Sequence, residues 1–584
     1  METLRYIFGF NAESPLLFTQ FYFWGFFALV YALFALLIEQ VPNSWGNKKL
    51  HLRNIYLLFV SWFFYYKTSG LFLLILAFVT ISDWLIARRI QRSEVSIQKK
   101  LWLTLSVVID LSLLFYFKYA YFFTNVVNSW CGTEFQVFDI FAYIGNGFAE
   151  AGRFSVDVIV LPVGISFYIF QVISYTCDVF RKKIEPVRNI LDFGFYVSFF
   201  PQLVAGPIVR AEEFIPQLYK PFRLSRRAFG IAVFWIINGL AKKIILSDYL
   251  AVNLIDRVFD NPLLFSGFEN LFALFCYSLQ VYADFSGYTD IAIGVAMLMG
   301  FYLPMNFNSP YKSQTPQEFW RRWHMSLGRW LKSYLYIPLG GNRTIFGKKV
   351  NKLWAANFNS FITQVLGGLW HGASWNFVLW GAINGAGMII EKIWREMHWH
   401  WRFALMTLLL FGLCVADYMT NLPVWRLFAV WTAIVWTGTA LRYIYFLFEG
   451  RDTKFTKALG TAWAVIQTFT FITFTRLFFR SSSNLDPATA NEVAWATAKN
   501  MINQIGGAWN NAIIPEFVWA YRWVVLLFVA GMIIHWLPTN WKRRYRLWFT
   551  AMPVWLIVIA VVISMVVIYQ FMTSDVQPFI YFQF

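Results

Sequence analysis

The chain has 584 residues, of which 58% are hydrophobic and 14% charged, and its formal net charge is +18. Soluble globular chains carry roughly 25% charged residues, so the composition excludes a disordered chain, a disulfide scaffold and a cytosolic enzyme. The apolar runs are also much longer than the ~10 residues of a membrane β-strand. The sequence therefore predicts an all-α polytopic membrane protein.

Apolar segments of spanning length follow one another along the whole chain. We expect two shorter pieces, which are tight spans or re-entrant segments, at 55–67 and 189–205. We expect full membrane spans near 16–38, 71–90, 101–127, 158–180, 226–247, 268–303, 402–418, 423–447, 461–479, 518–537 and 547–571.

Loop charge predicts the orientation of these spans, because Lys and Arg are enriched in cytoplasmic loops. The loops 88–100, 181–188 and 541–546 are basic and are predicted to be cytoplasmic, whereas 128–157 and 481–517 carry more acidic than basic side chains and are predicted to lie outside. The C-terminus then lies on the outer side. The same rule accounts for the high net charge without a nucleic-acid partner.

The four cysteines, which are Cys131, Cys177, Cys276 and Cys414, are scattered and form no CxxC pair. We therefore expect neither a metal site nor a disulfide framework.

Residues 312–352 carry nine Lys or Arg and one acidic residue, Glu318. As a single helix, 317–341 has an aromatic arc opposite a basic face, which predicts an interfacial helix with its basic residues towards anionic lipid. His324 falls inside the aromatic arc. His371 follows a glycine-rich segment with Gly367 and Gly368. Either histidine is a satisfied packing residue or a functional group, and an ionisable group at membrane depth favours function.

Four ordered segments carry a family resemblance: FFPQLVAGPIVR (199–210), YADFSGYTDIAIGVAMLMGF (282–301), FWRRWHMSLGRWLKSYLYIPLGGNR (319–343) and LGGLWHGASWNFVLWG (366–381). Together with SYTCDVFRKKIEP (174–186), they closely resemble the membrane-bound O-acyltransferase superfamily, in its branch of bacterial alginate O-acetylation proteins. The resemblance implies a ring of tilted transmembrane helices around a central funnel, with re-entrant and interfacial helices.

The resemblance also implies the chemistry. Its two histidine motifs fall on His324 and His371, so we expect both to be catalytic, with His371 as the principal base and the roles exchangeable. The donor is an acyl thioester such as acetyl-CoA, used as a substrate, and no bound cofactor or metal is expected. Lower-ranked candidates for substrate binding are Arg321, Arg322, Arg329, Arg343, Asp178 and Asp284.

Each of these candidates has an alternative. The arginines serve lipid headgroups as well as the phosphates of a donor. Asp178 is equally interpreted as half of a surface ion pair with Arg181 or Lys182. Asp284, like Asp290, either positions a helix break or contacts substrate.

We divide the chain into an N-terminal span and loop (1–50), a catalytic core (51–397), an extra helical hairpin that departs from the family pattern (398–458) and C-terminal helices (459–584) with the outer element 481–517. The predicted function is transfer of an acetyl group across a bacterial inner membrane for O-acetylation of an exopolysaccharide such as alginate, through an exported partner. The alternatives are D-alanyl transfer from a carrier protein and a non-enzymatic transporter or channel.

Overall fold

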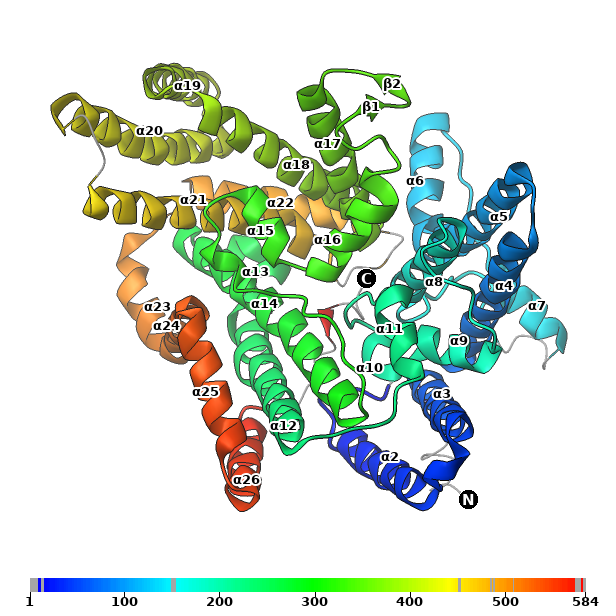
Figure 1. Cartoon of the computed structure of the whole chain (residues 1–584). Coiled ribbons are helices and arrows are strands. Elements are labelled where there is room, and N and C mark those ends of the chain that lie inside the picture. Colours follow the sequence, from blue (N-terminus) through cyan, green and yellow to red (C-terminus); the bar gives the residue numbers. More distant parts are fainter. Residues whose placement is uncertain are drawn as a thin grey trace. The chain divides into compact units, whose positions relative to one another are not determined.

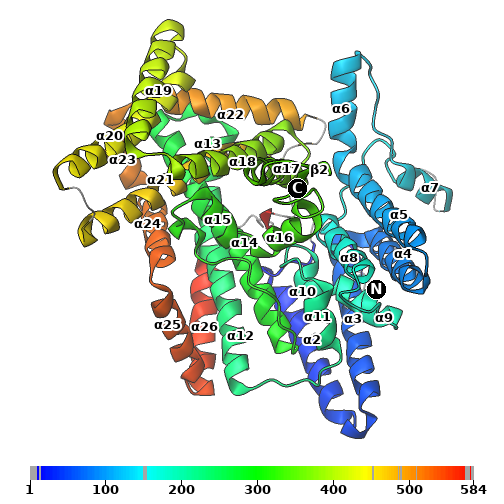
Figure 2. The same ribbon diagram turned by 45° about the horizontal axis from the view of Figure 1, so that its top comes forward.

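The computed structural model describes residues 9–11, 15–148, 154–449, 453–483, 486, 489–507, 509–572 and 579–580. Helices dominate these residues (Figures 1 and 2), and their only sheet is the antiparallel pair β1 (Thr344–Ile345) and β2 (Lys348–Lys349). Seven helical segments of the described chain are long and apolar enough to cross a membrane, and two bent helix pairs would bring this to nine. The protein is therefore an all-α polytopic membrane protein, as predicted.

The chain forms two compact units, each built from separate stretches of sequence. The first unit comprises 1–244, 284–306 and 540–584, and the second comprises 245–283 and 307–539. The long helix α14 (Gly267–Leu298) contributes residues to both.

The helices of the first unit are α2 (Phe21–Gln40), α3 (Asn47–Ser69), α4 (Leu73–Arg92), α5 (Ser96–Leu114), α6 (Ala120–Cys131), α7 (Ile140–Phe148), α8 (Ile165–Phe180), α9 (Ile190–Ser198), α10 (Phe200–Leu203), α11 (Ala211–Leu218), α12 (Arg226–Leu240), α25 (Thr539–Ala551) and α26 (Val554–Gln570).

The helices of the second unit, besides its part of α14, are α13 (Asp256–Asp260), α15 (Pro316–Arg322), α16 (Met325–Leu331), α17 (Lys352–His371), α18 (Trp375–Glu396), α19 (Trp399–Thr420), α20 (Pro423–Glu449), α21 (Lys454–Ser481), α22 (Ala490–Gly507), α23 (Ile514–Ala520) and α24 (Arg522–Trp536).

The core of the first unit is aromatic. Phe195, Phe199, Phe214 and Phe301 are fully buried, and their ring centroids lie between 5.1 and 5.9 Å apart. Large rings bury much apolar surface and gain further from tilted ring packing. A rigid aromatic core thus joins the short helices α9 and α11 to the chain after α14.

Several predicted segments differ from the helices of the structure. The piece predicted to be short at 55–67 belongs to the 23-residue helix α3, whereas the span predicted at 158–180 contains only the 16-residue helix α8. Residues 189–205 form two short helices, α9 and α10, because the chain leaves the helical conformation at Phe199 (φ −53°, ψ 110°). Hydropathy detects apolar runs but not such local turns.

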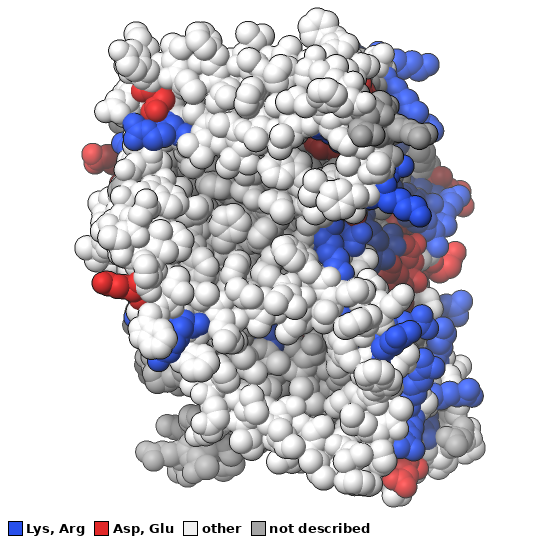
Figure 3. Space-filling model, turned by 90° about the vertical axis from the view of Figure 1, so that its left-hand side faces the viewer, with Lys and Arg blue, Asp and Glu red and all other residues white. Residues whose placement is uncertain are grey.

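Helices α19 and α20 pack against each other in the segment 398–458. Trp436 Nε1 donates a hydrogen bond of 2.8 Å to Thr407 Oγ1, and Phe403 stacks on Tyr443. Much of their apolar surface is exposed. In Figure 3 most Lys and Arg side chains lie towards the right-hand edge, and uncharged side chains cover most of the middle of the view. Such a surface is unfavourable in water and favourable against lipid.

Candidate active site

His324 lies at a break between two short helices, and the prediction of one continuous amphipathic helix over 317–341 is wrong. Helix α15 begins with Thr315 capping the Glu318 amide at 3.0 Å and ends at Trp323, which is extended. His324 then adopts a left-handed conformation (φ 43°, ψ 56°) before α16. This conformation costs a non-glycine residue about 1–3 kcal/mol and is retained where the surroundings impose it, often at functional sites.

The break does not bring His324 to the surface, because its side chain is only 2% exposed. Burial lowers the pKa of this imidazole to about 3, since the charged form loses its hydration. His324 lies outside the candidate membrane-spanning helices and is held neutral at physiological pH.

His371 is the last residue of α17, and glycines allow α17 to approach α18 closely. A Cβ atom at Gly368 would lie 2.3 Å from the Phe377 carbonyl oxygen, and one at Gly372 would lie 2.0 Å from the Phe377 ring. Any larger residue would therefore push the two helices apart. Close helix packing explains these two glycines, and it fixes the end of α17 where His371 stands.

The two histidines share one aromatic cluster. The ring of Trp370 lies 6.1 Å from that of His324 and 4.9 Å from that of His371, measured between centroids. His371 also contacts Trp380 at 5.2 Å and Phe479 at 5.3 Å. The fold thus brings together two buried imidazoles that are 47 positions apart in sequence.

Helix α21 borders this cluster, a contact that hydrophobic patterning alone does not predict. Its C-terminal end is joined to the start of α18 by hydrogen bonds of 3.0 Å, from Ser374 to Ser482 and from Asn376 to Ser481. Phe479 lies one turn earlier and contacts His371. The run of serines after the apolar segment 461–479 was the signal in the sequence, since hydroxyls at a helix end commonly bond to a neighbouring element.

The four candidate arginines differ in their surroundings. Arg321 and Arg343 are exposed, whereas Arg322 and Arg329 are half-buried. Arg322 is engaged by Glu318, with Nη2 and Nε donating to the same carboxylate oxygen at 2.7 and 2.9 Å. Arg322 thus forms an ion pair with Glu318, one turn earlier on its own helix. Asn359 of α17 donates to the Gly341 and Thr344 carbonyls at 2.8 Å, which holds the loop that carries Arg343.

The two candidate carboxylates belong to the first unit. Asp178 is fully buried and lies 3.4 Å from the Lys183 ammonium group, so the interpretation of Asp178 as a surface carboxylate is wrong. Asp284 forms an ion pair of 2.7 Å with Lys243, both almost fully buried, and its second oxygen accepts the Ile580 amide at 2.8 Å. Asp284 thus links three segments that are distant from one another in sequence.

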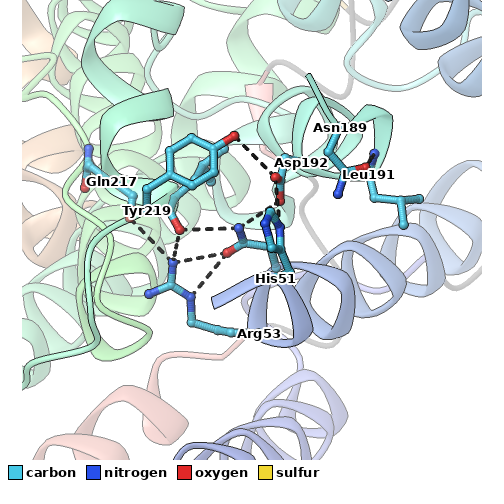
Figure 4. A network of polar contacts seen from close by, with 9 residues as sticks. His51, Arg53, Asn189, Leu191, Asp192, Gln217 and Tyr219 are labelled. Atoms are coloured by element: carbon cyan, nitrogen blue, oxygen red, sulfur yellow. Dashed lines mark hydrogen bonds and ion pairs between the residues drawn. The ribbon is translucent and has the colours of Figure 1, made fainter. Parts of the chain in front are cut away.

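A further polar network in the first unit surrounds Asp192 (Figure 4). Its carboxylate lies 3.1 Å from His51 Nδ1 and accepts hydrogen bonds from Asn54 at 2.9 Å and Tyr219 at 3.3 Å. Arg53, beside Asn54, donates to the Leu218 carbonyl at 2.8 Å. The partner of His51 is contributed by a distant segment, so this contact cannot be predicted from the sequence around His51.

No group of three or more His, Cys, Asp or Glu side chains in the part of the chain that the structure describes is arranged to hold a metal ion. The candidate site consists of two buried imidazoles in an aromatic setting. Such a setting suits proton transfer between a hydroxyl and a leaving group.

Part of the chain is similar to a known protein family and to curated proteins. The model of the membrane-bound O-acyltransferase family matches residues 183–404. A probable alginate O-acetylase of Azotobacter vinelandii is 41% identical over 345 residues, which cover 59% of this chain and 64% of the relative. The peptidoglycan O-acetyltransferase of Helicobacter pylori is 33% identical over 368 residues, covering 59% and 65%.

A more distant relative is the teichoic acid D-alanyltransferase of Bacillus subtilis, 29% identical over 250 residues that cover 41% of this chain and 61% of the relative. The chain spans slightly less than two thirds of the length of these curated relatives. The matched region contains both histidine motifs, and over this region the chain is similar to the membrane-bound O-acyltransferase family and to the alginate O-acetylases.

Proposed function

We propose that this protein is an O-acyltransferase that moves an acetyl group from a cytosolic thioester donor across the membrane, for O-acetylation of an exopolysaccharide such as alginate. The observation that carries the proposal is the pairing of His324 and His371 around Trp370. Both histidines are buried, and both lie within the matched residues 183–404. The names of the alginate and peptidoglycan relatives support acetyl transfer to a glycan hydroxyl.

In the proposed reaction, His371 accepts the proton of the acceptor hydroxyl. The hydroxyl oxygen attacks the thioester carbonyl, the carbon–sulfur bond breaks, and the departing thiolate takes up the proton. A positioned base typically contributes 10²–10⁴-fold to such a step. His324 orients the acyl group or relays the proton, and the two histidines can exchange these roles.

We propose acetyl-CoA as the donor substrate, with no bound cofactor. Arginines suit its phosphates because their planar forks bind oxyanions bidentately. Arg321, Arg329 and Arg343 are the candidates, and Arg321 is the most direct one to test because it is exposed. The variant Arg321→Ala should raise the KM for acetyl-CoA at unchanged kcat, whereas Arg522→Ala, on exposed α24, should change neither. An unchanged KM in Arg321→Ala, with weaker binding to anionic liposomes, would assign Arg321 to lipid.

We also propose a bacterial inner-membrane location, with the C-terminus on the outer side, and an exported partner that passes the acetyl group to the polymer. The predicted outer segments 128–157 and 481–517 are short, which leaves little protein outside to bind a polymer. The single Lys499 within 481–517 is consistent with this orientation.

Purified protein incubated with radiolabelled acetyl-CoA tests the proposal directly. Release of CoA that depends on both histidines is the expected result. Turnover only with a D-alanyl-loaded carrier protein would favour the chemistry named in the Bacillus subtilis relative. Absence of turnover with either donor, with solute passage in proteoliposomes, would mean that the protein is a transporter.

A further inference from the structure

Arg476 is a buried cation on α21, in the same unit as both histidines. Its side chain is 5% exposed. Its Nη1 atom donates to the Ser278 carbonyl at 3.0 Å and to the Tyr311 hydroxyl at 2.6 Å, and its Cζ atom lies 4.2 Å from the ring centroid of Trp323. A desolvated contact between a guanidinium and an indole is favourable, because the cation is attracted by the negative face of the ring.

No carboxylate pairs with Arg476 among the residues that the structure describes. Arg480, one turn further along α21, shows the usual arrangement, because its Nη2 lies 2.8 Å from Asp256 Oδ1. Burying a charge is costly unless it is paired, and a charge in a membrane-spanning helix is by default a functional group. The aromatic contacts offset only part of that cost.

The Nε–Nη2 edge of the Arg476 guanidinium has no hydrogen-bond acceptor among the described residues and can bind a ligand. Both hydrogens of Nη1 are donated to Ser278 and Tyr311. Nε and Nη2 donate to no described residue, and neither atom is completely buried. The Nε and Nη2 hydrogens form the fork that binds a carboxylate or a phosphate with two parallel hydrogen bonds.

The position of Arg476 links this edge to the histidine motifs. Trp323, against which Arg476 stacks, directly precedes His324. Phe479, one turn along α21 from Arg476, contacts His371 at 5.3 Å. One face of α21 therefore contacts both motifs.

We propose that Arg476 is an oxyanion-binding residue of this site, and that it takes a carboxylate or phosphate group of a substrate through its Nε–Nη2 edge. The phosphate would come from a CoA-type donor and the carboxylate from a uronate sugar of the acceptor. Assigning the anion to a substrate rests on the proposed function, whereas the binding itself does not.

Oxyanion binding by Arg476 can be tested by measuring the Tm of the full chain in detergent. The ionic strength is kept constant while chloride is replaced by glucuronate or by CoA. A ligand that binds only the folded state raises Tm. We expect wild type to be stabilised by one of the two anions, Arg476→Met to lose that response and Arg476→Lys to bind at least tenfold more weakly. Arg522→Met is the matched control, because Arg522 is an exposed arginine that also stacks on tryptophans.

A response to glucuronate alone assigns the edge to the acceptor, and a response to CoA alone assigns it to the donor. Equal responses in wild type and Arg476→Met would overturn the proposal. If the Met variant does not fold, the Lys variant decides, because an unweakened response without the fork would refute oxyanion binding at this edge. This experiment measures binding and not turnover. A protein that shows the Tm response but releases no CoA in the acetyl-CoA assay would therefore refute only the proposed function.

Discussion

The indole of Trp370 lies against the imidazole of His371, with ring centroids 4.9 Å apart and planes inclined by 75°. The same indole lies 6.1 Å from the ring of His324. Trp370 is 4% exposed, so this arrangement is enclosed by protein. Trp370 thereby contacts two histidines from different parts of the chain. His371 ends α17, and His324 lies between α15 and α16.

Replacing His371 by alanine should abolish acetyl transfer, because no other group at that position can accept the hydroxyl proton. The loss should be at least 10²-fold in kcat, with membrane insertion and yield unchanged. The measurement is CoA release by the purified variant. Turnover at the wild-type rate would remove His371 from the mechanism.

Replacing His324 by glutamine tests the second histidine. Glutamine keeps much of the volume and can form a hydrogen bond, but it cannot accept and carry a proton at neutral pH. We expect the variant to elute from size exclusion like wild type and to lose nearly all transfer. Full activity would show that His324 only packs. If the variant aggregates, His324→Asn provides the second substitution for the same assay.

The buried His324 also predicts a pH dependence of stability. Its pKa is about 3 in the folded protein and about 6.5 when unfolded, so the unfolded chain binds the proton more tightly. The fold is therefore fully stable with respect to this group above pH 6.5 and loses stability as the pH falls below it. Between pH 6.5 and 5 the loss is about 2 kcal/mol.

His324→Gln has no group to titrate there. Its Tm should therefore fall less than that of wild type between pH 7 and pH 5. Parallel decreases in the two proteins would show that His324 does not contribute to this pH dependence.

Alanine at Gly368 should destabilise the protein, because its Cβ would lie 2.3 Å from the Phe377 carbonyl oxygen and would separate α17 from α18. Overpacking of this kind typically costs 1–3 kcal/mol, and movement of α17 would displace His371. Detergent-extracted yield and Tm provide the measurement. Gly412→Ala on α19 is the matched control, since no atom lies within 4 Å of its Cβ position, and it should be neutral or slightly stabilising. Equal Tm values for both variants would contradict the steric argument.

The sequence by itself determined the class of the protein and the identity of its histidine motifs. Long apolar runs predict membrane helices because insertion depends on local hydrophobicity, which needs no knowledge of the final packing. The segments around His324 and His371 were identified because a long ordered run of residues is recognisable without coordinates. That both histidines share Trp370 could not be obtained in this way.

Only the tertiary structure decided the local course of the chain at His324. A helical wheel assumes an uninterrupted rotation of 100° per residue, and one left-handed residue after an extended Trp323 ends that rotation. The wheel placed His324 on an apolar face, and the side chain is buried, but the burial results from a turn between two helices.

The partners of the charged residues were likewise decided by the tertiary structure. Lys243 pairs with Asp284 and Arg480 pairs with Asp256, whereas Arg476 packs against aromatic rings without a carboxylate among the described residues. Periodicity relates residues within one helix, whereas an ion pair depends on which distant segments the fold brings within about 3 Å. The ionic partners across the fold therefore cannot be derived from hydrophobic patterning, since that pattern fixes which face is buried and not what lies against it.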